Sequence, residues 1–296
     1  MTSDTDVVVV GGGPAGCSAG IFTARYGLDT VVFDCGRSSL KQCAYLENYL
    51  GFPAGVDIET LYRLMHDHAE EAGCEFVTDL VESVERADDG DGFVVTAQEG
   101  RERTADYVVA ATRYDGEYLR PLDGDAMFDV HDHGGEEHEH FDRDYADHDG
   151  TTPIDGLYVA SPSAETDRQA IIAAGRGARV GLAVVGAGRR EQRYPEAFVD
   201  HYDWVRREAQ RDNEWADRDR WREWFAERLP SDHDLDEDRL VELREREIDR
   251  RLDTYVTESE VSARAERGQR RLLAHLDDDL VLERAREIRE EVDAAE

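Results

Sequence analysis

A glycine-rich stretch near the start of the chain has the residue types and spacing of a nucleotide-binding loop. Gly11-Gly12-Gly13-Pro14-Ala15-Gly16 matches the pattern G-x-G-x-x-G. A β-branched run precedes this loop, a helical pattern follows it, and the next apolar run ends in Asp34. A strand, a glycine loop, a helix and a second strand that ends in a carboxylate are the full context of a dinucleotide site.

The chemistry of these residues suits a pyrophosphate joined to a ribose. The glycines permit a tight turn, a close approach of the phosphates and close packing of the helix on the strand. Free N–H groups at the helix N-terminus attract the phosphates, and a carboxylate accepts hydrogen bonds from the ribose hydroxyls. The residues that we expect to contribute are Gly11, Gly13, Pro14, Ala15, Gly16 and Asp34.

The sequence contains one loop of this kind. Gly175–Gly188 is also rich in glycine, but it continues a helical run, and we expect it at a helix–sheet contact. A protein that binds FAD and NAD(P)H through two Rossmann units would show two such loops. The pattern therefore predicts one dinucleotide and leaves open whether it is FAD or NAD.

Cysteine supplies a second candidate for chemistry. Cys35 and Cys43 flank the segment that follows Asp34, where a dithiol would exchange electrons with a flavin or a disulfide. Their spacing is unlike that of a redox pair, and we favour the interpretation that each is a small buried side chain. Four cysteines without a Cys-x-x-Cys motif are also too few for a disulfide framework, so a reducing cytosol is the simplest setting.

Residues 123–150 form an acidic segment that is rich in histidine. Its histidines are His131, His133, His138, His140 and His148. Imidazoles beside carboxylates would bind Zn²⁺ or Ni²⁺. The segment lacks a periodic apolar pattern, so we interpret it as a solvated loop or a short irregular insert and predict no metal site. His66 and His68 have acidic neighbours in a helical pattern, and we expect both at the surface.

The elements that would position these residues alternate between strands and helices up to residue 188. We expect helices over residues 15–26, 57–72 and 169–185. We expect strands over residues 6–10, 30–34, 75–77, 80–86, 92–98, 107–111 and 157–160, with a hairpin around 88–92. This order predicts an α/β domain with a Rossmann-like sheet over residues 1–188.

The chain changes character after residue 188, where Gly268 is the only glycine. We expect about five helices there, which form an acidic all-α C-terminal domain over residues 189–296. Pro195 suits the first turn of a helix, and Thr257-Glu258-Ser259-Glu260 fits a capping box. We interpret the tryptophans as the core of a small bundle rather than as the cover of a cofactor; they are Trp204, Trp215, Trp221 and Trp224. A solvated, partly frayed tail is the alternative.

Charge excludes several functions. The chain has 69 acidic and 35 basic residues, which give a formal net charge of -34. Such a surface repels nucleic acid and anionic membranes, and we find no apolar run near the roughly 18 residues of a spanning helix. Molar salt would screen the mutual repulsion of the carboxylates. The composition therefore favours the salty cytoplasm of a halophile over an ordinary acidic protein.

Several short motifs, in order along residues 5–187, resemble the FAD-binding half of the low-molecular-weight thioredoxin reductase family. The loop with Asp34 is similar to that family's FAD loop, and Glu47–Pro53 is similar to its E-N-Y-P-G-F-P stretch. Ala110–Thr112 resembles its A-T-G strand end, and residues 156–170 resemble its closing G-L-Y-A-A-G-D…R-Q-A segment. The resemblance implies a three-layer FAD/NAD(P)-binding domain with FAD as its cofactor.

The resemblance also implies roles for residues outside the loop. Asn48 and the segment Arg168-Gln169-Ala170 would lie near the flavin ring, and Gln42 near the ribityl chain. Thr112 would lie on the adenosine–pyrophosphate side, and Val81 close to the adenine.

The chain departs from the family pattern in four ways. The interval from Thr112 to Gly156 is too short for the NADPH domain that the family inserts there, and the redox Cys-x-x-Cys of that domain is missing with it. Ser161-Pro162 replaces the Gly-Asp that holds the ribityl chain. Arg113 replaces the glycine of A-T-G, where its charge would either pair with a phosphate or block one.

We therefore expect an FAD-dependent oxidoreductase related to thioredoxin reductase, without its own NADPH domain and redox dithiol. Electrons would come from a redox partner protein or a small-molecule donor that the sequence does not name, and the catalytic residues stay unassigned. The alternatives are a non-catalytic flavin or nucleotide sensor, or an interaction protein, and an NAD-binding protein. The oligomeric state is open, a homodimer included.

Overall fold

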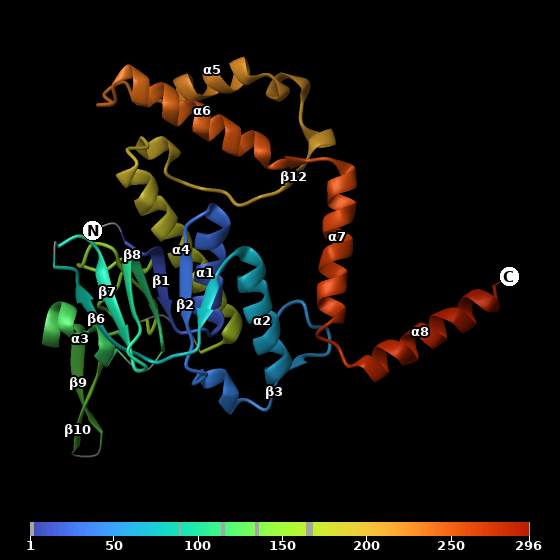
Figure 1. Cartoon of the computed structure of the whole chain (residues 1–296), viewed down its shortest axis with the longest axis horizontal. Coiled ribbons are helices and arrows are strands. Elements are labelled where there is room, and N and C mark those ends of the chain that lie inside the picture. The colour runs from blue at the N-terminus through green and yellow to red at the C-terminus, as the bar shows by residue number, and fades with distance from the viewer. Residues whose placement is uncertain (1–2, 89, 114–115, 134–135, 164–167, 296) are drawn as a thin grey trace. The chain divides into compact units, whose positions relative to one another are not determined.

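The computed structural model describes residues 3–88, 90–113, 116–133, 136–163 and 168–295. It separates into two compact units, Met1–Asp203 and Trp204–Glu296, which are both drawn in Figure 1. The boundary that we expected at residue 188 falls inside helix α4 (Ala170–Glu191). The first unit therefore extends to the end of that helix and through the segment that follows it.

Parallel strands form the centre of the first unit, in the order β5-β2-β1-β8-β11. These strands are β1 (Thr5–Val10), β2 (Thr30–Phe33), β5 (Glu75–Val77), β8 (Glu102–Ala111) and β11 (Leu157–Ser161). Because parallel strands end at the same edge of a sheet, the segments after β1, β2, β8 and β11 meet there. This carboxyl edge is where open α/β sheets bind their ligands.

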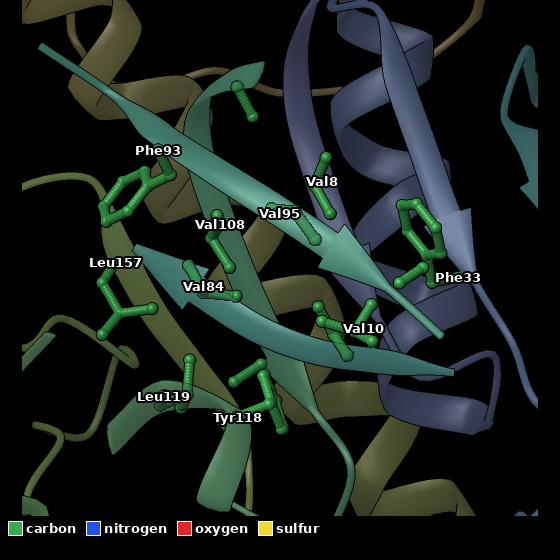
Figure 2. Packing of buried hydrophobic residues seen from close by; sticks show 14 of the residues in the cluster. Val8, Val10, Phe33, Val84, Phe93, Val95, Val108, Tyr118, Leu119 and Leu157 are labelled. Atoms are coloured by element: carbon green, nitrogen blue, oxygen red, sulfur yellow. The ribbon is translucent and has the colours of Figure 1, made fainter. Parts of the chain in front are cut away.

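Strand β1 is apolar at successive positions because both faces of the sheet are covered. Val7 and Val9 belong to a buried cluster on the helix side, whereas Val8 and Val10 belong to a second cluster on the opposite side. Figure 2 shows Val8 and Val10 in this second cluster, near Phe33. The strand that we expected over residues 6–10 is confirmed.

A hairpin of β6 (Val81–Arg86) and β7 (Phe93–Ala97) forms the layer opposite the helices. Strand β7 also pairs with the first half of β8, which explains why β8 begins earlier than we predicted. Val84, Phe93 and Val95 point from this hairpin into the second cluster (Figure 2). The predicted hairpin and the three-layer α/β fold are both confirmed.

Helices α1 (Pro14–Tyr26), α2 (Ile58–Ala72) and α4 form the helical layer of the first unit (Figure 1). A Cβ atom on Gly177 would overlap the carbonyl group of Ala15, and one on Gly181 would lie 2.7 Å from the carbonyl oxygen of Ala19. The glycines of α4 therefore face α1. The helix–sheet contact that we expected for Gly175–Gly188 is, at these positions, a helix–helix contact.

Helix α4 is long and apolar enough to cross a membrane by length and composition alone, which corrects our expectation that no run approaches that length. Its Val180 and Val184 are fully buried in the cluster on the helix side of the sheet. These contacts are those of a core helix, and length and composition alone are weak evidence for a membrane span.

The segment between β2 and α2 is short and irregular. It contains a 3₁₀ turn over Ser39–Gln42 and a two-residue strand pair formed by β3 (Tyr45–Leu46) and β4 (Val56–Asp57). Leu40, Leu46 and Leu61 pack in a small cluster beneath this segment.

The interval between β8 and β11 contains a second hairpin, which corrects our expectation of a loop over residues 123–150. The described elements there are 3₁₀ turns over Glu117–Leu119 and Gly124–Met127, α3 (Arg120–Asp123), β9 (Phe128–His133) and β10 (Glu136–Phe141). Phe128 and Phe141 pair across the hairpin with ring centroids 5.8 Å apart, and Phe141 is buried. Two aromatic rings at its base therefore anchor a segment whose acidic sequence shows no apolar period.

The second unit is helical apart from a two-residue parallel pair, β12 (Arg206–Arg207) with β13 (Tyr255–Val256). Its helices are α5 (Arg218–Arg228), α6 (Glu237–Asp253), α7 (Glu258–Leu273) and α8 (Asp278–Asp293), with 3₁₀ turns over Glu208–Gln210 and Asn213–Ala216. Thr257 and Glu260 form the predicted capping box at the start of α7. Pro195 precedes a 3₁₀ turn over Glu196–Phe198 in the first unit rather than an α-helix.

The tryptophans of the second unit divide between core and surface. Trp221 is buried, its Nε1–H donates to the carbonyl oxygen of Trp215 at 2.8 Å, and the two ring centroids lie 4.6 Å apart. This confirms a bundle core around α5 and α6. Trp204 is 66% exposed, so our interpretation of this residue as part of the bundle core is wrong.

Candidate dinucleotide site

The loop Gly11–Gly16 crosses the carboxyl edge of the sheet between β1 and α1. Gly11 has a φ of 113°, and a Cβ atom there would lie 2.6 Å from the carbonyl oxygen of Ala111 at the end of β8. A Cβ atom on Gly16 would overlap the carbonyl oxygen of Gly11. Glycine at both positions is thus required for the tight turn and for the close packing of α1 that we predicted.

The N-terminus of α1 has the features of an anion site. Gly13 is the N-cap residue and offers no side-chain hydrogen bond, while Pro14 occupies the first turn. The N–H groups of Ala15 and Gly16 therefore receive no cap from Gly13, and the helix dipole adds positive potential at this end. There is also little space beside Gly13, because a Cβ atom there would lie 3.3 Å from Ser38 Oγ.

Asp34 lies beside the loop, directly after β2. A Cβ atom on Gly12 would lie 2.6 Å from Asp34 Cβ, so the carboxylate stands against the loop backbone. Asp34 Oδ1 accepts the N–H of Gly36 at 2.9 Å. The side chain is partly exposed and has further acceptor capacity. This arrangement suits a carboxylate that accepts hydrogen bonds from a ribose.

His66 is a site residue that the sequence did not reveal. Its Nε2 lies 3.0 Å from the carbonyl oxygen of Gly12 and 3.4 Å from Asp34 Oδ2. Both oxygens are acceptors, since the first belongs to a carbonyl group and the second to a carboxylate, so Nε2 carries the proton. The ring also stacks on Phe76 with centroids 4.4 Å apart.

Our expectation that His66 lies at the surface is therefore wrong, whereas His68 is exposed as predicted. The spacing of His66 from apolar residues of the same helix could have revealed its position. His66 lies four residues after the buried Tyr62 and three before the buried Ala69, on the apolar stripe of α2.

The predicted flavin-ring residues come together on the other side of the edge. Asn48 Nδ2 donates to Gln169 Oε1 at 2.8 Å, which joins the segment after β2 to the residue that precedes α4. Ala170 packs against the small cluster around Leu46 and Ile58, and Arg168 is exposed. Gln42 is exposed at the end of its 3₁₀ turn, and its predicted proximity to the ribityl chain stays a prediction.

Two of the departures from the family pattern, Arg113 and Ser161-Pro162, lie next to each other in the structure. Arg113 follows β8 with a φ of 66°, and its backbone N–H donates to the carbonyl oxygen of Ser161 at 3.4 Å. Its side chain extends toward the segment after β2, where Nη1 donates to Ser39 Oγ at 2.7 Å. Thr112 Oγ1 lies 3.4 Å from the hydroxyl of Tyr118. An arginine thus spans the edge from the ends of β8 and β11 to the segment after β2.

Val81 lies deeper than the other predicted residues. It begins β6, is 5% exposed and packs in the cluster that contains Phe33 and Val77. Its predicted proximity to an adenine stays a prediction.

The cysteines divide into two buried and two exposed. Cys17 and Cys74 are buried, and burial raises the pKa of Cys74 to about 12 and raises that of Cys17 further, so neither forms a thiolate at neutral pH. Cys35 and Cys43 are exposed, which corrects our interpretation of them as buried side chains. In the part of the chain that the structure describes, no group of three or more histidine, cysteine or acidic residues is placed to hold a metal ion. The side chains of His133, Glu136 and Glu137 lie outside that part.

A family model for pyridine nucleotide-disulphide oxidoreductases matches residues 5–189. The chain belongs to this family. The match covers the loop, the sheet, the hairpin layer and nearly all of α4, and it ends before the second unit. Family membership therefore rests on the elements that position the candidate site.

Curated relatives of this pyridine nucleotide-disulphide oxidoreductase include thioredoxin reductases. That of Rickettsia conorii is 32% identical over 121 residues, which are 40% of this chain and 38% of the relative. That of Streptomyces clavuligerus is 33% identical over 115 residues, which are 38% of this chain and 35% of the relative. These matches span less than two fifths of the length of each relative.

Solved thioredoxin reductases share the fold. The enzyme from Gloeobacter violaceus superposes with a TM-score of 0.52 at 18% identity, over 69% of this chain and 98% of the other. The atypical enzyme from Desulfovibrio vulgaris gives a TM-score of 0.51 at 19% identity, over 63% of this chain and 99% of the other. At such identities the likeness establishes the fold alone.

Proposed function

We propose that the chain is an FAD-binding oxidoreductase related to thioredoxin reductase that receives electrons from an external donor. Family membership supports a flavin-linked redox activity. The observation that carries the proposal is the meeting, at one edge of the sheet, of the loop Gly11–Gly16, Asp34 and the Asn48–Gln169 pair. The glycine loop suits the pyrophosphate and Asp34 the ribose, whereas the amide pair suits the polar edge of an isoalloxazine ring. Bound FAD would supply the redox chemistry, while the protein binds and orients it.

The interval between β8 and β11 supports an external donor. Its described residues form short helical turns and the β9–β10 hairpin, with no second glycine loop between strand and helix. A nicotinamide nucleotide would thus have no Rossmann unit of its own there. Either a redox partner protein or a small-molecule donor would reduce the flavin.

Arg113 favours a second candidate, a flavin or nucleotide sensor without catalysis. Its side chain bonds to Ser39 and its backbone to Ser161, at the place where the family has a glycine and a Gly-Asp pair. A guanidinium there adds a cation, and Pro162 removes a carboxylate. Such a site would hold the phosphates more tightly than the ribityl chain.

The visible absorption spectrum of the protein, purified in molar KCl, tests flavin binding. We expect a flavin spectrum, either as purified or after reconstitution with FAD. A colourless protein that FAD cannot reconstitute would refute the oxidoreductase and leave only a sensor of another nucleotide. Asp34→Ala should weaken FAD binding by about 1–2 kcal/mol, because a charge-assisted hydrogen bond is lost. Asp106→Ala, in the first half of β8, serves as the control and should leave affinity unchanged.

Photoreduction then separates the oxidoreductase from the sensor. The reduced protein should be reoxidised by at least one acceptor in a panel that includes oxygen, disulfides and quinones. Reoxidation by none of them at a rate above that of free flavin would favour the sensor.

We also propose that the protein works in the cytoplasm of a salt-adapted cell. The net charge of -34 supports high salt, and the exposed thiols of Cys35 and Cys43 suit a reducing compartment.

A further inference from the structure

Helices α7 and α8 leave their apolar side chains uncovered. No residue of either helix is buried in the described chain. In α6 of the same unit, by contrast, Leu243 and Ile248 are fully buried. Leu272 and Ile288 are 55% and 47% exposed, and further exposed apolar residues are Leu273, Leu276, Leu280, Leu282 and Val292. Exposed apolar residues gathered on two neighbouring helices of a highly charged chain mark an interaction surface.

The two helices share one apolar spacing. The α7 seam consists of Val261, Ala265, Gly268 and Leu272. The α8 seam consists of Val281, Ala285, Ile288 and Val292. In both, the intervals are four, three and four residues, which places the seam on one face of the helix and matches the core positions of a coiled coil. The structure therefore presents two matched seams, and the second unit buries neither of them.

Isolated helices of this length are marginal in water, so their stability depends on packing of the apolar face. The seams also differ in size at their third position, where the α7 seam has Gly268 and the α8 seam has the bulky Ile288. Knobs-into-holes packing inserts bulky side chains into the space beside such small residues.

Charge selects which helices pair. Helix α7 carries four arginines and three glutamates, whereas α8 carries three arginines and seven acidic residues. Two α8 helices would repel each other, whereas α7 and α8 attract. A short linker, residues 274–277, joins the two helices, and neither helix has a buried residue. A second copy of the chain can supply the missing partner for each seam at once.

We propose that α7 and α8 form the interface of a homodimer in which α7 of each copy packs against α8 of the other. Two identical α7–α8 contacts related by a twofold axis close the assembly and cover all four seams. Molar salt screens the remaining charge repulsion and leaves the apolar contact intact. The interface is independent of the cofactor and of the proposed redox activity.

Light scattering coupled to size exclusion in molar KCl tests the proposal on the full chain. We expect a mass of twice 33.5 kDa, which falls toward that of one chain on dilution. Leu272→Glu places a charge in the α7 seam and should lower the association constant about tenfold or more, since burying an unpaired charge is costly. Ala263→Glu adds the same charge on the opposite face of α7 and should leave the mass unchanged.

Ile288→Glu repeats the test in the α8 seam, and circular dichroism shows whether each variant keeps its fold. Hydrogen exchange gives a second measure, because the amides of α7 and α8 should lose protection on dilution while those of α6 keep it. A wild-type chain that is monomeric at all concentrations would overturn the proposal. So would a dimer that survives both seam substitutions, because it would use another surface.

Discussion

Asn48 donates a hydrogen bond to Gln169, 2.8 Å away, across 121 residues of sequence. Asn48 lies in the segment after β2 and Gln169 in the segment after β11, so the pair joins two segments that leave the same edge of the sheet from strands that are not adjacent. Both side chains are exposed, and each keeps unused donors and acceptors. The sequence resemblance proposed a flavin contact for each residue separately, and the structure makes them a single polar unit.

His66 should contribute to nucleotide binding by fixing the position of Asp34 relative to the backbone of Gly12. His66→Ala removes the Nε2–H donor and should weaken FAD binding about fivefold, as expected for one lost hydrogen bond. His66→Gln can still donate an N–H and should restore part of the affinity. The measurement is FAD titration followed by fluorescence. His68→Ala, on the exposed side of the same helix, is the control, and equal effects of both alanine substitutions would contradict the role of His66.

Arg113 should act as a phosphate contact rather than as a block. Arg113→Gly relieves a left-handed backbone that costs an L-residue about 1–2 kcal/mol, so the cofactor-free protein should be at least as stable. FAD affinity should fall, because a cation is lost at the edge. Arg193→Gly is the matched control: Arg193 has a φ of 67° at the end of α4, away from the loop, and its loss should leave FAD affinity unchanged. Tighter binding by Arg113→Gly would instead mean that the arginine blocks a phosphate.

Two glycines of α4 should respond in opposite ways to the same substitution. Gly177→Ala forces a Cβ atom into the carbonyl group of Ala15 and should lower the free energy of unfolding by about 1–3 kcal/mol. At Gly175 a Cβ atom would meet nothing within 4 Å. Gly175→Ala should therefore raise the free energy of unfolding by up to about 1 kcal/mol, because alanine has the higher helix propensity. Urea unfolding measures both. A neutral Gly177→Ala would show that α1 and α4 lie farther apart.

Glu245 should make the stability of the second unit depend on pH in the acidic range. Hydrogen bonds from Arg222, and also from Arg218 and Arg244, lower the pKa of Glu245 to about 2. A carboxyl group with a depressed pKa stabilises the fold above its ordinary pKa of 4.5 and loses that contribution as the pH falls toward 2. Glu245→Gln should therefore be less stable than wild type at neutral pH, by on the order of 1 kcal/mol for a partly exposed network. Thermal melts from pH 7 downward should show the difference shrinking; a constant difference would exclude titration of Glu245.

Salt should stabilise the chain strongly. Raising KCl from about 0.1 M to about 2 M shortens the Debye length to a few ångströms and screens the repulsion behind the net charge of -34. The midpoint of thermal unfolding should rise by several degrees. An uncharged osmolyte that raises the midpoint equally well at low salt would contradict an electrostatic cause.

The sequence by itself determined the order of the parallel strands and main helices of the first unit, the nucleotide loop and the capping box at Thr257. These features follow from local rules, because a β-branched run, a glycine spacing or a cap residue acts on its own neighbours in the chain. Gly11 and Gly16 could be assigned their roles for the same reason. The candidate loop was therefore predictable from residues 5–34 alone.

Only the tertiary structure decided which distant side chains meet. His66 lies beside Asp34 because its ring stacks on Phe76 of β5, the strand next to β2. Arg113 lies beside Ser39 and Ser161 because β8 pairs with its neighbours in the sheet. The β9–β10 hairpin is ordered by Phe128 and Phe141, which the surrounding acids and histidines obscure. The exposed seams of α7 and α8 likewise emerge only once the buried residues of α5 and α6 are known. Contacts between distant residues depend on packing, and packing is a property of the whole fold.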